Sequence, residues 1–291
     1  MASPNFHDLK LYVVTYIDVL GQSSRLERLG ELLNNQRSND LVQTEANRTI
    51  GVVYRIREAF EKVMGKLGND YVIGDPPYQG VSPYKKAEIL KLTRFEYKFQ
   101  YFSDTVLVYT PLATKDRKCI VAHLLGMLAA TGNLMAATLS MEIPIRGSVE
   151  IGWAVEWAGG GFYGPVLHNV YHLENDVAEY PRIVVGDKSR SYISSSLNNQ
   201  DDGSLLCEVN KKQASLCARM IKYIDGSPTV DFLGQAMVNL SASKNHDAIV
   251  KQGFDFVCRE YEKAKKSNNS RLRSQYELLK TYYLQNSGLV G

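Results

Sequence analysis

The hydrophobic and polar positions along the chain predict strands and helices in a definite order. The run LKLYVVTYIDV over residues 9–19 is almost continuously apolar and β-branched, which is typical of a central strand buried on both faces. Residues 94–110 alternate aromatic with polar positions and then become apolar, so they predict a β-hairpin whose turn is FSD. Another strand is predicted over IPIRGSVEIGWAVEW, residues 143–157.

Helical spacing of apolar residues follows the first strand. LGQSSRLERLGELL predicts a polar turn and then a helix, and residues 50–68 predict a second amphipathic helix. Residues 69–91, which hold three prolines, predict a surface loop. The segment of about 117–140 predicts a long buried helix, and HNVYHLENDVAEY predicts a further helix with PRIVVG as the strand after it.

This order of elements is that of an α+β fold with a ferredoxin-like βαββαβ core. The polar stretch SYISSSLNNQDDGS marks a candidate boundary, so we expect a domain over 1–190. Residues 191–291 are then a mostly helical extension that packs on the core or supports a dimer.

Composition narrows the class of protein. With 44% hydrophobic and 22% charged residues the chain is typical of a soluble globular protein, and a net charge of +3 does not indicate a nucleic-acid partner. The basic run 263–266 is most simply a solvated helix face. Segment 119–139 is long enough to span a bilayer, yet its polar residues favour a buried helix without membrane contact. Four cysteines without CxxC spacing and a polar N-terminus predict a cytoplasmic location.

Two carboxylates carry the candidate chemistry. Asp18 interrupts the first buried strand, where an ionised group is costly unless it is paired or binds a metal; a salt bridge or helix cap is the alternative. Asp104 lies at the hairpin tip, where aspartate is a common turn residue. In a ferredoxin-like fold these two positions are neighbours. Two carboxylates that close would repel unless divalent cations lay between them, as in two-metal displacement at phosphorus.

YIDVLG, the FSD hairpin, the IRG strand and YGPVLHNVYHLE, spread over residues 9–187, resemble the class III nucleotide cyclases. More narrowly, FSDTVLVY, IRGSVEIG and LEN…YPRIVV are similar to the pyrimidine cyclases of Pycsar anti-phage defence. Those enzymes make cyclic UMP or cyclic CMP, a signal that activates a separate effector protein.

The resemblance implies a metal and phosphate site. Asp18 and Asp104, with the backbone carbonyl of Val19, would hold two Mg²⁺ or Mn²⁺ ions. One ion would lower the pKa of the ribose 3′-hydroxyl and the other would neutralise the triphosphate. The strand–turn–helix start also suits a phosphate, which the backbone amides of Leu20, Gly21, Gln22 and Ser23 would cradle. Arg146 matches a triphosphate-binding arginine, and a plain surface salt bridge is the alternative.

The base and ribose positions depart from the family. Gln100 stands where purine cyclases have a lysine; its carboxamide suits a pyrimidine edge, unless it is only a polar residue on a sheet face. The family's acidic base reader falls on Gly161, which argues against adenylate cyclisation. The family's asparagine and arginine of the late helix fall on His168 and His172, or on Asn169 and Leu173 after a one-residue shift. Arg182 is a possible substitute for the arginine, and a structural histidine pair stays open.

The resemblance therefore implies a head-to-tail homodimer with composite sites that converts UTP to 3′,5′-cyclic UMP and pyrophosphate in anti-phage defence. A cytidylate or purine nucleotide cyclase is one alternative. A catalytically inactive cyclase-like nucleotide sensor is another.

Overall fold

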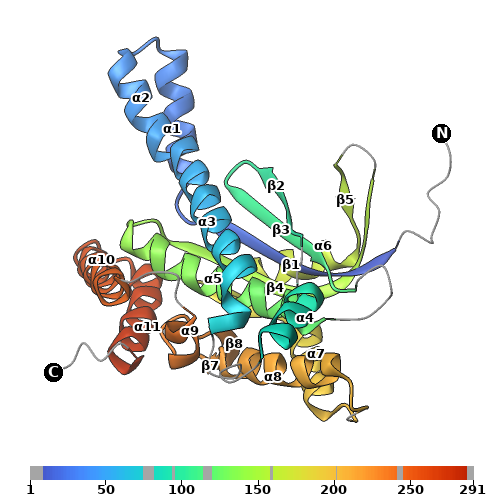
Figure 1. Ribbon diagram of the computed structural model, residues 1–291. Coiled ribbons are helices and arrows are strands. Elements are labelled where there is room, and N and C mark those ends of the chain that lie inside the picture. Colours follow the sequence, from blue (N-terminus) through green and yellow to red (C-terminus); the bar gives the residue numbers. More distant parts are fainter. Residues whose placement is uncertain are drawn as a thin grey trace.

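A mixed sheet with helices on both faces forms the centre of this α+β protein (Figure 1). The computed structural model describes residues 9–74, 82–93, 96–113, 120–157, 160–200, 202–240 and 245–286. The strand order is β2-β3-β1-β4-β6-β8-β7, and β5 pairs with β4 outside this path. The strands are β1 (Lys10–Val19), β2 (Lys98–Phe102), β3 (Thr105–Pro111), β4 (Ile145–Glu156), β5 (Phe162–Tyr163), β6 (Ile183–Val185), β7 (Ile221–Ile224) and β8 (Ser227–Val230).

The helices are α1 (Ser23–Asn34), α2 (Asn39–Arg48), α3 (Ile50–Gly74), α4 (Pro83–Thr93), α5 (Val121–Ser140), α6 (Pro165–His172), the π-helical turn η3 (Leu173–Val177), α7 (Asp187–Asn198), α8 (Leu205–Arg219), α9 (Gln235–Asn239), α10 (His246–Lys266) and α11 (Ser270–Asn286). Figure 1 shows α1 and α2 extending away from the sheet, while α10 and α11 pack beside α5.

Strand β1 lies inside the sheet and is antiparallel to both neighbours, β3 and β4. Its side chains alternate between two cores. Val13 and Ile17 lie in the larger core with residues of α3 and α5, whereas Tyr12 and Val14 lie in a smaller core with residues of α6. We call the side of the sheet that carries the smaller core the α6 face. The burial of β1 on both sides confirms the strand predicted over residues 9–19.

Helix α5 confirms the long buried helix predicted from the sequence, and it begins at Val121 within the described residues. Among the described helices it is the one that is long and apolar enough to cross a membrane, but 83% of its most apolar window is buried inside the protein. Burial on this scale is typical of the core helix of a soluble protein.

The surface loop predicted over residues 69–91 is wrong for most of its length. Helix α3 continues to Gly74 and α4 covers Pro83–Thr93, while residues 75–81 lie outside the described part. Pro83 is the first residue of α4, where a missing backbone N–H has no cost because that group would be unpaired in any case. Pro83, one of the three prolines that suggested a loop, therefore marks a helix start.

The polar stretch near residue 190 does not interrupt the core. It forms α7 as far as Asn198, and β7 and β8 then extend the same sheet beside β6. The large core also combines residues from both sides of this position, among them Leu139 of α5 and Tyr283 of α11. A helix as apolar as α5 needs covering on several sides, and the C-terminal helices supply part of that cover.

Candidate functional site

The register of the sheet gathers polar side chains at one end of β1. Asp18 lies opposite Thr105 of β3 and opposite Arg146 of β4. Asp104 comes directly before Thr105 in the β2–β3 turn, next to Ser103, whose φ of 56° is left-handed. The structure therefore brings both carboxylates and the arginine to the same end of three adjacent strands.

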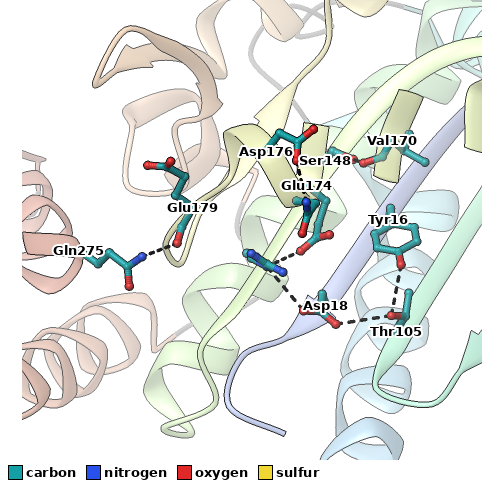
Figure 2. Close-up of polar contacts among 11 residues, drawn as sticks. Tyr16, Asp18, Thr105, Ser148, Val170, Glu174, Asp176, Glu179 and Gln275 are labelled. Atoms are coloured by element: carbon teal, nitrogen blue, oxygen red, sulfur yellow. Dashed lines mark hydrogen bonds and ion pairs between the residues drawn. The ribbon is translucent and has the colours of Figure 1, made fainter. Parts of the chain in front are cut away.

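The ionisation of Asp18 reflects this crowding. Burial raises the pKa of Asp18, and the negative charge of Asp104 raises it further, while Arg146 opposes both effects. Asp104 directly precedes Thr105, the residue opposite Asp18 in the sheet, and this position lets its charge act on Asp18. Figure 2 shows the hydroxyl of Thr105 next to Asp18, to which it donates over 3.5 Å, and Tyr16 beyond Thr105.

Arg146 forms ion pairs with two carboxylates from different elements. Its Nε lies 3.5 Å from Oδ2 of Asp18 and also pairs with Oε1 of Glu174. Neither contact of Nε has hydrogen-bond geometry, so both are ion pairs. The Glu174 side chain is 3% exposed, and burial raises the pKa of its carboxyl to about 7, although Arg146 acts in the opposite direction.

Glu174 was not predicted as a site residue, although the sequence holds a signal for it. Val166 and Val170 are buried against the sheet, and Glu174 continues the same four-residue spacing into η3. An acid on the buried stripe of a helix is costly unless it has a partner, so it predicts a cation opposite. The partner, Arg146, lies on a strand, and no helical periodicity could identify it.

One of the four amides predicted to cradle a phosphate, in the turn after β1, is already engaged within the protein. The amide of Leu20 is not available, since it donates to the carbonyl of Pro144 over 3.0 Å. Gly21 has a φ of 78°, and Gln22 caps α1 without a side-chain hydrogen bond. The first amides of α1, beginning with Ser23, therefore lack a side-chain acceptor from the cap residue, and such amides attract anions.

Gln100 lies on the α6 face of the sheet, opposite Leu107 of β3, and is not brought into contact with Asp18. Its side-chain amide donates to the carbonyl of Gly160. Nearby, Lys98 of β2 forms an ion pair with Glu156 of β4, and Tyr12 of β1 donates to Glu156 over 2.9 Å. Gln100 thus belongs to a separate polar group beside the smaller core.

The histidines of α6 lie on the outer side of that helix. Their rings meet edge to face with centroids 4.3 Å apart, and both side chains are exposed. Nδ1 of His172 lies 2.7 Å from Asp176, and this hydrogen bond lowers the pKa of the Asp176 carboxyl. Because Val166 and Val170 occupy the inner side, His168 and His172 do not contact Asp18 within one chain.

Arg182 does not join the site, so the possibility that it replaces the late-helix arginine receives no support. It is 4% exposed, and its guanidinium donates to the backbone carbonyls of Val177 and Ile224. The same group stacks on the ring of Tyr180, 4.3 Å from its centroid. Arg182 therefore ties η3 and β7 to the sheet.

The donor set at the end of β1 fits a divalent cation in its chemistry. Carboxylate oxygens are the ligands that Mg²⁺ and Mn²⁺ prefer, and a cation would relieve the repulsion between Asp18 and Asp104. Among the described residues no group of three or more His, Cys, Asp and Glu side chains is arranged to hold a metal. Two carboxylates, with backbone or substrate oxygens, are the set that this part of the chain offers.

Comparisons of the chain with protein families, with curated proteins and with solved structures give no match.

Proposed function

We propose that this protein is a class III nucleotide cyclase that converts UTP to 3′,5′-cyclic UMP and pyrophosphate. The arrangement of β1 to β4 supports the proposal. Their order is β2-β3-β1-β4, with β1 antiparallel to β3 and β4, which is the order of a ferredoxin-like βαββαβ core.

The observation that carries the proposal is the placement of Asp104 next to Thr105, which lies opposite Asp18 at the end of β1 that leads into α1. Asp18, Asp104 and the backbone carbonyl of Val19 would hold two Mg²⁺ or Mn²⁺ ions. When bound, these ions would lower the pKa of the ribose 3′-hydroxyl and place positive charge opposite the triphosphate. The early amides of α1 offer hydrogen bonds to phosphate oxygens, and Arg146 offers a permanent positive charge at the same end of the sheet.

A homodimer belongs to this proposal. His168 and His172 are exposed on the outer side of α6 and away from the Asp18 of their own chain, so they could reach only a nucleotide held by another copy. The exposed aromatic rings of Trp153 on β4, Trp157 directly after β4 and Tyr163 on β5 are candidates for the dimer contact. The signalling role, with a separate effector that reads the cyclic nucleotide, rests on the sequence resemblance alone.

The test is an assay of the purified protein with each of the four nucleoside triphosphates and Mn²⁺, with products separated by chromatography. We expect the wild type to make cyclic UMP from UTP. The turnover rates of Asp18→Ala and Asp104→Ala should each be at least about 100-fold lower. Asp40→Ala, which removes an exposed aspartate of α2, is the matched control and should keep full activity. Near-normal turnover by either site variant would disprove the two-metal assignment, and cyclic CMP or a cyclic purine nucleotide would correct the substrate.

A second candidate is a catalytically inactive cyclase-like nucleotide sensor. It is favoured by the ion pair between Asp18 and Arg146, which engages a carboxylate that catalysis would need for a cation. A sensor would bind a nucleoside triphosphate in a calorimeter and give no cyclic product in the same four-nucleotide assay.

A further inference from the structure

Arg146 is held between two carboxylates that differ in their access to solvent. Asp18 on β1 has 20% of its side chain exposed and lies beside Asp104 at the strand ends. Glu174 in η3 has only 3% exposed, and Arg146 of β4 is its ion-pair partner among the described residues. Figure 2 shows both of these carboxylates, with Asp18 below Glu174. The arginine therefore has an open partner and a closed one.

A divalent cation and a guanidinium cannot both occupy the same side of Asp18 without repulsion. Positive charges a few ångströms apart at a partly buried site repel more strongly than in water, because the surroundings screen them less. An arginine does not lose its proton, so it can give way only by moving. When the Arg146 side chain moves away from Asp18, Glu174 is the carboxylate that still pairs with it. Arg146 then stays beside the proposed cation site.

We infer that Glu174 is a positioning residue for Arg146: it retains the guanidinium when a divalent cation takes Asp18, so that Arg146 then faces the triphosphate. In the cation-free protein Arg146 covers Asp18, and cation binding exchanges one positive charge for another on that carboxylate. This inference rests on the proposed function, because it assumes a cation at Asp18 and a triphosphate beside it.

The elements that carry the three residues make such an exchange possible. Arg146 and Asp18 are fixed opposite one another by the β1–β4 register, so their backbones cannot separate without loss of the sheet. Glu174 is fixed from the other side, because the preceding turn of helix packs Val170 into the smaller core. Movement is therefore confined to the Arg146 side chain, which has several rotatable bonds and is 20% exposed.

The test measures Mn²⁺ binding by titration calorimetry without nucleotide, so that its readout does not depend on turnover. We expect Arg146→Met to tighten Mn²⁺ binding about tenfold, because Asp18 is released from its competitor. Glu174→Gln should weaken Mn²⁺ binding about tenfold, because Arg146 then pairs with Asp18 alone. A tenfold change in affinity is of the size usually found when one of two contacting residues is replaced. The glutamine keeps the shape of the side chain, so circular dichroism should show an unchanged fold.

The double variant separates positioning from a general loss of negative charge. Once Arg146 is replaced, burial keeps Glu174 protonated, so Arg146→Met with Glu174→Gln should bind Mn²⁺ within about threefold of Arg146→Met alone. In the loaded enzyme, Glu174→Gln should raise the KM for UTP more than it lowers kcat, since it affects triphosphate binding. Glu45→Gln is the matched control: Glu45 is equally buried and pairs with Arg28 and Arg48 on α1 and α2, so Mn²⁺ binding should be unchanged.

Additive effects in the double variant, or Mn²⁺ binding by Glu174→Gln within twofold of the wild type, would overturn the inference while leaving the cyclase proposal standing. If the Mn²⁺ affinities of the single and double variants change as expected but no cyclic product forms, the inference is supported and the cyclase proposal is disproved. Failure of the folded wild type to bind Mn²⁺ would overturn both.

Discussion

Buried glutamates in this protein differ in the groups that surround their carboxylates. Glu150 of β4 is 4% exposed and accepts hydrogen bonds from the backbone and the hydroxyl of Ser189, at 2.8 and 3.0 Å, so it caps the start of α7. Glu174 is equally buried but faces one guanidinium, and burial raises the pKa of its carboxyl to about 7. The two acids are about equally buried and differ in the number of hydrogen-bond donors around them.

The raised pKa of Glu174 predicts a pH-dependent stability. In the unfolded chain the pKa returns to 4.5, so the folded protein binds the additional proton between about pH 4.5 and 7. The contribution of Glu174 to stability is therefore fully present below pH 4.5 and is lost as the pH rises through 7. Glu174→Gln, which stays neutral, lacks this dependence.

The measurement is thermal unfolding of both proteins in buffer with a chelator, from pH 5 to 8. The wild type should lose melting temperature relative to Glu174→Gln by a few degrees over this range. A constant difference between the two proteins would show that Glu174 is already ionised at pH 5.

At the scale of elements, the site depends on how closely β1 and β4 approach. Gly147 follows Arg146 and lies opposite Ile17, and a Cβ atom on it would lie 2.3 Å from the carbonyl oxygen of Tyr16. That oxygen belongs to the backbone and cannot rotate away. The spacing of the two strands, and with it the distance between Asp18 and Arg146, therefore requires glycine at this position.

Gly147→Ala should accordingly destabilise the protein by about 2 kcal/mol, a usual cost of overpacking, and should reduce activity by shifting Asp18. Urea unfolding measures the first effect. Gly30→Ala in α1 is the matched control, because nothing lies within 4 Å of its added Cβ and alanine favours a helix by up to about 1 kcal/mol. Equal stability of Gly147→Ala and the wild type would contradict the close approach of the strands.

At the scale of the whole molecule, the part of the chain beyond residue 190 completes both the sheet and the core. Strand β8 pairs with β6, and α10 packs on α5. Val230 and Phe256 from this part share the large core with Leu134 of α5. Removal of these elements would expose an apolar helix and an unpaired strand edge to water.

A chain that ends at residue 190 is therefore expected to be insoluble or to unfold without a cooperative transition. Circular dichroism during urea unfolding of the truncated and the full-length chains would measure this. A cooperative transition in the truncated chain would show that residues 1–190 form an independent domain, as the composition near this position suggested.

The sequence by itself determined the strands and helices whose periodic patterns are local. The run 9–19, the hairpin, the buried helix from Val121 and the strand that carries Arg146 follow from apolar spacing alone. The sequence also singled out Asp18, because a charge in a buried strand is a local anomaly, and Asp104, because it lies at the tip of the predicted hairpin. Proline content misled over residues 83–91, because proline permits a helix start as well as a turn.

Only the tertiary structure decided which polar groups meet. Three contacts join segments that are far apart in the chain or are placed by the register of two strands. They are the ion pair between Glu174 and Arg146, the hydrogen bond from Leu20 to Pro144 and the hydrogen bond from Arg182 to Ile224. Periodicity identifies the side on which a residue lies but not the residue opposite it. That choice depends on strand order and register, which are settled by the packing of the whole core.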